Sequence, residues 1–340
     1  KMKKQHKIKK PKRCNRSDFF DPPTLLVKEP KEMKPQQLEE LEKMASDYEV
    51  IKGWDNESDF PTEKIDILYG WDKEKGQTLL EDEKSQLKWI QMPSAGVDYM
   101  NLDLLAEKDI RLTTASGIHS VPISESVLGM LLAYVRGIQQ SIRQQTEKQW
   151  EEPTGMEELN NKTIMIVGTG HIGKEVGRLA KAFNMKTIGI NRSGRNVETM
   201  DEIYQQKDLI DHVDEADVLV NILPLTDETK HFFDQKIFSK MKEGSLFINV
   251  GRGPSVKTED LIAALQNGPV AFAGLDVFDE EPLPKESPLW EMENVLITPH
   301  ISGIAEHYKT RLFTIFKENL QAYLEGEALP RNLVDYNKSY

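Results

Sequence analysis

Short apolar runs and helix-like segments alternate along most of the chain. The apolar runs of the first third are Thr24–Val27, Ile65–Tyr69 and Leu87–Met92, and helical periodicity runs through Leu38, Leu41 and Met44 and again over Met100–Glu107. Such alternation is typical of β-α units that build a mainly parallel sheet. The pattern therefore predicts an α/β fold.

Residues 121–145 carry a longer helical pattern. Pro122 suits a first helical turn, where its missing N–H would be unpaired anyway. Val127, Leu131 and Val135 supply an apolar face. We predict one continuous helix here and expect it to bridge two domains.

From Lys162 onward the alternation restarts with stronger apolar runs. Six strand candidates follow, namely Thr163–Val167, Ile188–Ile190, Val218–Leu223, Leu246–Val250, Phe272–Val277 and Val295–Thr298. Helices are expected over Glu175–Phe183, Thr258–Gln266 and Ala305–Leu324. Six strands with intervening helices fit a complete dinucleotide-binding domain.

Composition indicates a globular protein, and charge is distributed unevenly along the chain. The 340 residues are 38% hydrophobic and 29% charged, which is typical of a globular protein long enough for two domains. Residues 1–16 carry nine Lys/Arg and no acid, whereas the rest of the chain has 35 basic and 56 acidic residues. The acidic body argues against nucleic acid as a partner, because phosphate contacts need clustered cations. We expect the tail, residues 1–20, to be disordered and solvated; an RNA-binding arm or a targeting element is the alternative.

Several classes of protein are disfavoured by what the chain contains. No apolar segment follows the basic tail as in a signal peptide, and the longest apolar run, Val127–Val135, is too short to span a membrane. Cys14 is the single cysteine, so one chain offers no disulfide, zinc cluster or cysteine nucleophile beyond it. We therefore expect a cytoplasmic protein with no metal site and no membrane partner.

A glycine-rich turn follows the first strand of the second half. Gly168, Gly170 and Gly173 form the pattern G-x-G-x-x-G between the strand Thr163–Val167 and a helix. The first glycine permits a tight turn, the second lets the backbone approach a pyrophosphate, and the third lets helix and strand pack closely. The helix N-terminus then offers unpaired N–H groups to the phosphates. The turn, including Thr169, His171 and Ile172, is predicted to bind a dinucleotide.

The end of the next strand bears on which dinucleotide binds. An NAD site is expected to have an acid about 20 residues past the glycine turn, for the ribose 2′-hydroxyl. This chain has Asn191 there, followed by Arg192, Ser193 and Arg195. An uncharged residue beside cations suits a 2′-phosphate. We expect NADP(H) rather than NAD(H), which stays possible; an ordinary basic surface turn is the other interpretation.

Three further motifs follow strand candidates, at Asn249–Gly253, Leu275–Pro282 and Thr298–Gly303. Reduction of a 2-keto acid needs a cation for the carboxylate and carbonyl, and Arg252 suits that role. It also needs an acid for the new alkoxide, and His300 suits that role because imidazole titrates near neutral pH. Glu281 is suited to orient the imidazole. Taken singly, each residue is as compatible with an ordinary structural position.

Taken together, the motifs resemble those of the D-isomer-specific 2-hydroxyacid dehydrogenases, over about Thr24 to Leu333. The resemblance is carried by Ser94–Asp98, Val167–Gly173, Leu223–Thr226, Asn249–Gly253, Gly274–Pro282 and Thr298–Gly303. It implies an Arg252–Glu281–His300 catalytic set, Asp276 at the nicotinamide carboxamide, and the Ala95-Gly96-Val97 turn at the substrate carboxylate. The other cofactor contacts that it implies are Leu223, Pro224, Val250, Gly251 and Gly303.

The resemblance also implies an architecture. A flavodoxin-like substrate domain, residues 21–119 plus 299–335, is expected around an inserted Rossmann-type NAD(P)-binding domain, residues 120–298. Family members are usually dimers, with the long helix after Ser120 at the interface, so a homodimer is expected.

Three positions depart from the family pattern or narrow the substrate. His119 stands where Asn is usual. The loop that contains Trp71 lacks the arginine of phosphoglycerate-type members, which disfavours a phosphorylated substrate, and Trp71 is expected to form an apolar wall instead. Formate-acting members have Gln at the position of Glu281, so the resemblance disfavours formate as the substrate.

The sequence thus predicts an NADPH-dependent reductase of small 2-keto acids, such as glyoxylate or hydroxypyruvate, that forms D-2-hydroxy acids. The alternatives are a phosphoglycerate- or phosphite-type dehydrogenase of the same fold and a cofactor-gated, corepressor-like binding protein.

Overall fold

The computed structural model describes residues 22–28, 33–54, 62–97 and 99–336. The chain divides into two compact units, the first made of residues 1–118 and 306–340 and the second of residues 119–305. The predicted basic tail and Asp98 lie outside the described residues. Each unit is described separately below.

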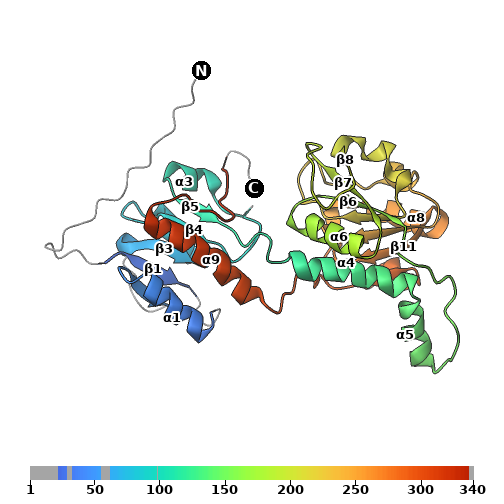
Figure 1. Ribbon diagram of the computed structural model, residues 1–340, viewed down its shortest axis with the longest axis horizontal. Coiled ribbons are helices and arrows are strands. Elements are labelled where there is room, and N and C mark those ends of the chain that lie inside the picture. Colours follow the sequence, from blue (N-terminus) through green and yellow to red (C-terminus); the bar gives the residue numbers. More distant parts are fainter. Residues whose placement is uncertain (1–21, 29–32, 55–61, 98, 337–340) are drawn as a thin grey trace, which may run out of the picture. The chain divides into compact units, whose positions relative to one another are not determined.

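The first unit contains a five-stranded parallel sheet in the order β2-β1-β3-β4-β5 (Figure 1). Its strands are β1 (Thr24–Val27), β2 (Glu49–Lys52), β3 (Ile65–Tyr69), β4 (Trp89–Gln91) and β5 (Arg111–Thr113), and its helices are α1 (Pro35–Met44), α2 (Lys73–Glu81), α3 (Leu102–Glu107) and α9 (Tyr308–Glu325). Residues of α1 and α9 share an apolar cluster with one face of the sheet, and residues of α2 and α3 share a cluster with the other face. The apolar runs predicted for β1, β3 and β4 are confirmed, whereas β2, β5 and α2 were not predicted.

A buried carboxylate fastens the C-terminal helix α9 to this sheet. Asp66 on β3 is 4% exposed, and it accepts hydrogen bonds from the hydroxyls of Tyr48 (2.7 Å) and Tyr323 (2.8 Å) and from Lys88 Nζ (2.8 Å). Burial, with the charge of Asp66 second, raises the pKa values of both tyrosines above their ordinary value. Trp89 stacks on Tyr323 at a centroid distance of 5.4 Å. Helix α9, near the C-terminus, therefore packs in the same core as the strands β3 and β4.

The second unit contains a seven-stranded parallel sheet in the order β12-β11-β10-β9-β6-β7-β8. The strands are β6 (Thr163–Val167), β7 (Lys186–Asn191), β8 (Glu202–Gln205), β9 (Val218–Asn221), β10 (Ser245–Asn249), β11 (Val270–Leu275) and β12 (Val295–Ile297). All six predicted strands are present, and β8 is an additional edge strand. The strand order reverses between β6 and β9, which is where ligands bind in sheets of this type.

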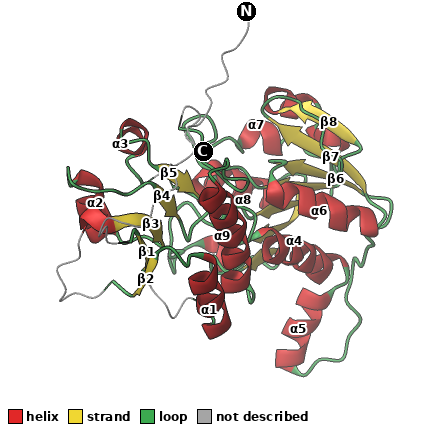
Figure 2. Cartoon of the chain, turned by 60° about the vertical axis from the view of Figure 1, so that its left-hand side comes forward, coloured by secondary structure: helices red, strands yellow, loops and turns green. Residues whose placement is uncertain are grey.

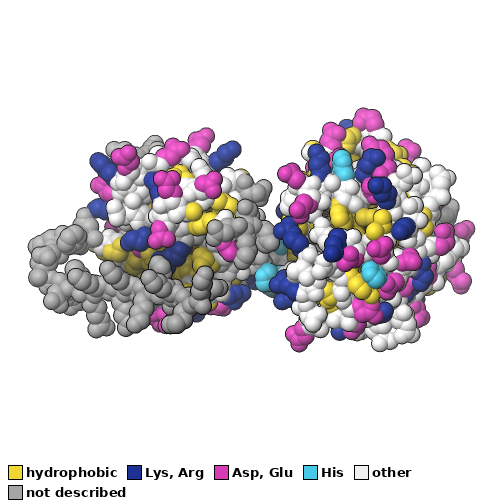
Figure 3. Space-filling view, turned by 90° about the horizontal axis from the view of Figure 1, so that it is seen from above, with side chains coloured by type: hydrophobic (Ala, Val, Ile, Leu, Met, Phe, Trp, Pro, Cys, Tyr) yellow, Lys and Arg dark blue, Asp and Glu magenta, His cyan; other side chains and the backbone are white. Residues whose placement is uncertain are grey.

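Helices cover both faces of this sheet, so the predicted α/β fold class is confirmed. On one face, α4 (Ser120–Val135) and α6 (His171–Ala182) pack on the sheet and on each other (Figure 2). On the other face lie α7 (Gln235–Phe238) and α8 (Thr258–Asn267). In the face of the second unit that Figure 3 shows, basic and acidic side chains are interspersed.

The prediction of one helix over residues 121–145 is wrong. The segment forms α4 and a separate helix α5 (Ile138–Glu147), bent by 65° at the break. Gly137 at the break has φ +64°, and a Cβ there would lie 2.5 Å from Pro153 Cβ. Within the described residues no single helix is long and apolar enough to cross a membrane; α4 and α5 pass that test only when counted as a bent pair.

Candidate active site

The glycine turn joins β6 to α6 by a very close approach of backbone to backbone. Gly168 has φ +107°, and its N–H donates to Ile190 O at 2.9 Å. A Cβ on Gly173 would lie only 2.1 Å from Gly168 O, so the helix packs directly on the turn. A Cβ on Gly170 would meet no protein atom within 4 Å. The turn therefore needs glycine at position 173 for its own packing and leaves open space beside Gly170.

These features fit a dinucleotide pyrophosphate. Open space beside Gly170 lies at the N-terminus of α6, where unpaired N–H groups favour an anion. His171 and Ile172 are the first residues of the helix. Thr169, 2% exposed, is held by a 3.0 Å hydrogen bond from Asn191 Nδ2. When bound, a nicotinamide dinucleotide supplies hydride chemistry at this edge of the sheet.

Asn191 shapes the loop that follows β7. It is 8% exposed; its Nδ2 also donates to Arg195 O (3.0 Å), and its Oδ1 accepts from Arg195 N (3.1 Å). Ser193, Arg192 and Arg195 are exposed on this loop. The buried Asn191 amide thus holds the turn on which Arg192 and Arg195 are exposed. The sequence predicted Asn191 as a cofactor contact and did not predict that it holds this turn.

An acidic side chain opposes one of these arginines. Arg192 Nη2 lies 3.4 Å from Glu228 Oε2, and both side chains are mostly exposed, 63% and 74%. Glu228 belongs to the loop after β9, 36 residues further along the chain. This acid was not predicted from the sequence, because only the fold brings the two loops together.

The loops after β9 and β10 are held by two buried asparagines, of which Asn249 begins a predicted motif and Asn221 was not singled out from the sequence. Asn221 and Asn249 are the last residues of their strands and bond to each other at 2.9 Å. Their side-chain oxygens accept the N–H groups of Leu223 (3.0 Å) and Gly251 (3.2 Å). A Cβ on Gly251 would lie 2.8 Å from Leu223 O, so the two loops touch. The predicted contacts Leu223, Pro224, Val250 and Gly251 therefore lie in adjoining loops at one sheet edge.

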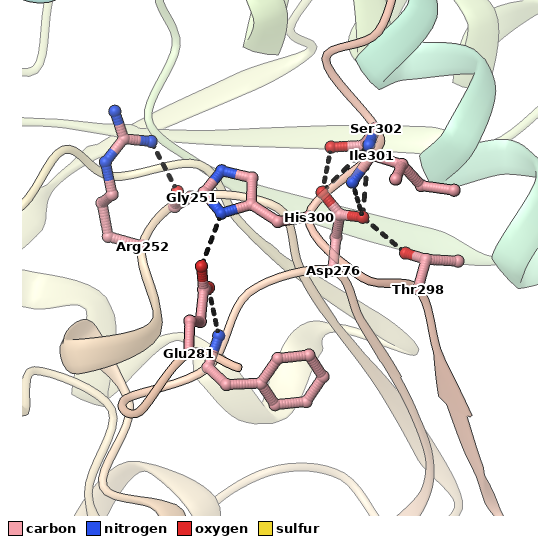
Figure 4. A network of polar contacts seen from close by, with 9 residues as sticks. Gly251, Arg252, Asp276, Glu281, Thr298, His300, Ile301 and Ser302 are labelled. Atoms are coloured by element: carbon pink, nitrogen blue, oxygen red, sulfur yellow. Dashed lines mark hydrogen bonds and ion pairs between the residues drawn. The ribbon is translucent and has the colours of Figure 1, made fainter. Parts of the chain in front are cut away.

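His300 and Glu281 form a direct pair (Figure 4). His300 Nδ1 lies 2.7 Å from Glu281 Oε2, and the other oxygen, Oε1, accepts from Phe278 N at 2.9 Å. A carboxylate only accepts, so Nδ1 is the donor and Nε2 is the ring nitrogen left for substrate. The side chains are 54% and 35% exposed, which leaves the imidazole accessible.

Arg252 follows β10, next to the strand that leads to Glu281. Its Nη1 donates to Gly251 O at 2.8 Å. A Cβ on Gly253 would lie 1.8 Å from Phe278 O, so the Arg252 loop packs against the loop that carries Glu281. Since β10, β11 and β12 are consecutive in the sheet, the structure brings Arg252, Glu281 and His300 to one edge of the second unit.

Asp276 lies behind the His300 turn. It is 0% exposed, and its carboxylate accepts hydrogen bonds from Thr298, Ile301 and Ser302. Residues 299–305, expected in the substrate domain, belong to the second unit. His119 Nδ1 lies 2.8 Å from Gly303 O. The expected bond between Asp276 and a nicotinamide carboxamide stays a prediction.

The expected substrate residues belong to the first unit. Ala95 and Gly96 are exposed in the turn after β4, where Ser94 Oγ donates to Gly96 O at 2.8 Å. Val97 is 5% exposed and packs in the core, so its side chain is not available to a substrate. Trp71, after β3, covers Gly76, where a Cβ would lie 2.6 Å from the indole.

Comparison with known proteins decides the family. The model of the NAD binding domain of D-isomer specific 2-hydroxyacid dehydrogenases matches residues 128–302. The chain belongs to this family. The resemblance found in the sequence is thereby confirmed, as is a nicotinamide dinucleotide as its cofactor.

Similar proteins cover most of the chain. Glyoxylate/hydroxypyruvate reductase B of Salmonella schwarzengrund is 34% identical over 274 residues, which span 79% of this chain and 84% of that protein. Glyoxylate reductase of Aeropyrum pernix is 30% identical over 320 residues, 90% of this chain and 94% of that protein. The structure of an NADPH-dependent glyoxylate/hydroxypyruvate reductase from Sinorhizobium meliloti, in complex with NADP and sulfate, has a TM-score of 0.73 and 28% identity, and covers 94% of this chain and 100% of its own.

Two alanine substitutions in the glycine turn are expected to have different effects, one on cofactor binding and the other on stability. Gly170→Ala places a methyl group in open space, so the melting temperature stays near wild type while the Kd for NADPH rises at least about tenfold. Gly173→Ala forces a methyl group against Gly168 O and lowers stability by about 1–3 kcal/mol. Thermal unfolding and fluorescence titration with NADPH measure the two effects. Unimpaired NADPH binding by Gly170→Ala would contradict the placement of the pyrophosphate.

Proposed function

We propose that this chain is an NAD(P)H-dependent reductase of small 2-keto acids, with glyoxylate and hydroxypyruvate as first candidates, and that it forms D-2-hydroxy acids. The observation that carries this proposal is the 2.7 Å His300–Glu281 pair, which lies with Arg252 on three consecutive strand ends of the unit that holds the glycine turn. The names of the Salmonella and Aeropyrum relatives support this substrate class.

Each residue has a distinct part in the proposed reduction. The Arg252 guanidinium binds the substrate carboxylate and polarises the keto oxygen. His300 donates the Nε2 proton to that oxygen as it becomes an alkoxide. Glu281 holds the imidazole by its Nδ1 hydrogen bond and stabilises the charged ring before transfer. We assign cofactor binding to the second unit and capture of the carboxylate, through the N–H groups of Ala95 and Gly96, to the first.

Removal of the proposed acid is the first test. His300→Ala is expected to lower kcat/KM for glyoxylate about 10²- to 10⁴-fold, because no other group then protonates the alkoxide. Activity is measured as NADPH oxidation against a panel of 2-keto acids that includes a phosphorylated one. His212 offers a matched control, since its Nδ1 also lies 2.7 Å from a carboxylate, Glu215, outside the site. Inactivity of the wild type on every keto acid, or full activity in His300→Ala, overturns the proposal.

We further propose that the cofactor is NADP(H) in preference to NAD(H). Arg192 and Arg195 at the end of β7 are the cations that would receive a 2′-phosphate, and the NADP complex of the Sinorhizobium protein supports that preference. Glu228 competes for Arg192 and repels a 2′-phosphate, so it limits the preference.

Glu228→Gln is therefore expected to tighten NADPH binding about two- to fivefold and to leave NADH binding unchanged, since an exposed ion pair is worth about 1 kcal/mol or less. Fluorescence titrations with both cofactors measure this difference. Asp227→Asn is the control, as it removes the neighbouring charge but not the partner of Arg192. An equal change for the two cofactors, or a clear preference of the wild type for NADH, contradicts the assignment.

We also propose a homodimer that uses the α5 region. α5 has no buried residue, and it presents Ile138 and Ile142, 47% and 57% exposed, while Trp150 in the following loop is 102% exposed. Large apolar side chains left exposed in one region of the surface favour association. The cytoplasmic location and the lack of membrane and nucleic-acid partners stay predictions from composition.

The dimer is tested by sedimentation. The wild type is expected to sediment as a dimer and the double variant Ile142→Asp, Trp150→Ser as a monomer, because a buried charge and a lost indole destabilise an apolar interface. Phe183→Ser, which changes an exposed apolar residue directly after α6, is the control. A monomeric wild type refutes the proposal.

A further inference from the structure

A buried serine follows Arg252 in the chain and binds back to its main chain. Ser255 is 0% exposed, and its Oγ donates to the carbonyl oxygen of Arg252 at 2.5 Å. The backbone N–H of Ser255 donates to the same carbonyl at 3.2 Å. The carbonyl of Ser255 accepts from Phe233 N at 3.0 Å, and Phe233 is also 0% exposed. Ser255 is therefore anchored in the core and holds the main chain of Arg252 from that side.

The direction of the hydrogen bonds around Ser255 is fixed by its neighbours. A backbone N–H only donates, so the Asn249 atom that Gly251 N meets at 3.2 Å is the oxygen Oδ1. Asn221 lies 2.9 Å from that oxygen and therefore presents its Nδ2 there, which leaves the second Nδ2 proton for Ser255 Oγ at 2.7 Å. The Ser255 hydroxyl accepts this bond and has a single proton, which goes to Arg252 O. A continuous chain of hydrogen bonds thus runs from Asn221 through Ser255 to Arg252.

These bonds restrain the main chain on both sides of the Arg252 Cα atom. The N–H group of the preceding Gly251 is bonded to Asn249, and the carbonyl of Arg252 is bonded to Ser255. The Arg252 side chain is exposed, and its Nη1 donates to the Gly251 carbonyl of the same loop (Figure 4). An exposed side chain that is bonded to its own loop is directed by the conformation of that loop. The restraint on the loop therefore determines where the guanidinium lies.

We propose that Ser255, supported by Asn221, is a positioning residue: its hydroxyl holds the Arg252 carbonyl so that the guanidinium is presented to the substrate carboxylate. Asn221 Oδ1 also accepts from Leu223 N (3.0 Å), so one buried amide supports both the Arg252 loop and the loop after β9. The consequence for catalysis rests on the proposed reductase function, whereas the restraint on the loop does not.

The test begins with a readout that needs no turnover. Ser255→Ala removes the donor to Arg252 O and leaves one proton of Asn221 Nδ2 without its acceptor, which loosens the loop. Hydrogen exchange of a peptide spanning 250–256 is expected to become at least about tenfold faster, while a peptide spanning 168–173 exchanges as in the wild type.

A second buried serine on the same strand provides the matched control. Ser245 begins β10 and is 1% exposed, and its Oγ has no hydrogen-bond partner among the described residues. Ser245→Ala therefore removes a buried hydroxyl but no hydrogen bond, and it is expected to leave exchange over 250–256 and kinetics unchanged. Ser255→Cys keeps a weak donor in place and gives a smaller effect, which keeps the test usable if Ser255→Ala fails to fold.

Kinetics then separate positioning from a general structural role. Ser255→Ala is expected to lower kcat/KM for glyoxylate about 10- to 100-fold, because a displaced guanidinium binds the carboxylate and polarises the keto oxygen less well, while the Kd for NADPH changes less than about threefold. The same substitution is also made in an Arg252→Ala background. There it is expected to lower kcat/KM less than about twofold further, since a residue that acts through the Arg252 guanidinium has nothing left to position.

The possible failures are distinguishable. Unchanged exchange over 250–256 in Ser255→Ala overturns the proposal whatever the enzyme does. An equal loss of kcat/KM with and without the Arg252 guanidinium, or an equal loss in Ser245→Ala, shows a general structural role and also overturns it. A wild type that reduces no keto acid refutes the proposed function, and hydrogen exchange still decides whether Ser255 restrains the loop.

Discussion

Parallel pairing of the strands in the second unit places all their carboxyl ends at one edge of the sheet. Neighbouring strands lie about 4.8 Å apart, so loops that follow β10, β11 and β12 are within side-chain reach of one another. Arg252, Glu281 and His300, separated by up to 48 positions in the chain, depend on this constraint for their proximity. The glycine turn after β6 opens on the same edge, since β6 runs parallel to the other strands.

Buried polar side chains at the strand ends give these loops a defined shape. Asn221 and Asn249 end β9 and β10, and Asp276 directly follows β11. Each accepts an N–H group from the loop that it adjoins or from the turn above it. A buried polar group is costly without a partner, and a loop N–H group is equally costly when it leaves solvent. A hydrogen bond between the buried side chain and the loop N–H group avoids both costs. The conformation of the loop is therefore fixed by bonds to buried residues.

Features with local causes were predictable from sequence, and features made by long-range contacts were not. The strand Thr163–Val167 and its glycine turn follow from a β-branched run and three glycines, and the structure has both where the sequence predicted them. The strand β8 lies at a sheet edge, half-buried throughout, so its residues lack the apolar run that marks the interior strands. The break at Gly137 was not predicted because glycine is tolerated within helices and no neighbouring residue indicates the close approach to Pro153.

The residues of the candidate site also divide into those that the sequence indicates locally and those that only long-range contacts reveal. Residue types after the strands suggested Arg252, Glu281 and His300 as candidates, because reduction needs a cation, an acid and a carboxylate to orient the acid, and the resemblance to the family implied the same three residues. The partner of Arg192 was missed because Glu228 comes 36 positions later, after another strand. Asp276 was found as a motif residue, but its donors lie 22 to 26 positions further on, and only the fold shows that they surround it.

The three side chains proposed for catalysis lie in a single unit, which has a consequence for evolution and engineering. Arg252, Glu281 and His300 all lie between residues 119 and 305, and the bonds that orient the His300–Glu281 pair are internal to that unit. Their mutual geometry is therefore supported by bonds made within residues 119–305. The first unit is free to diversify, or to be exchanged between relatives, while the three residues proposed for proton transfer are inherited together.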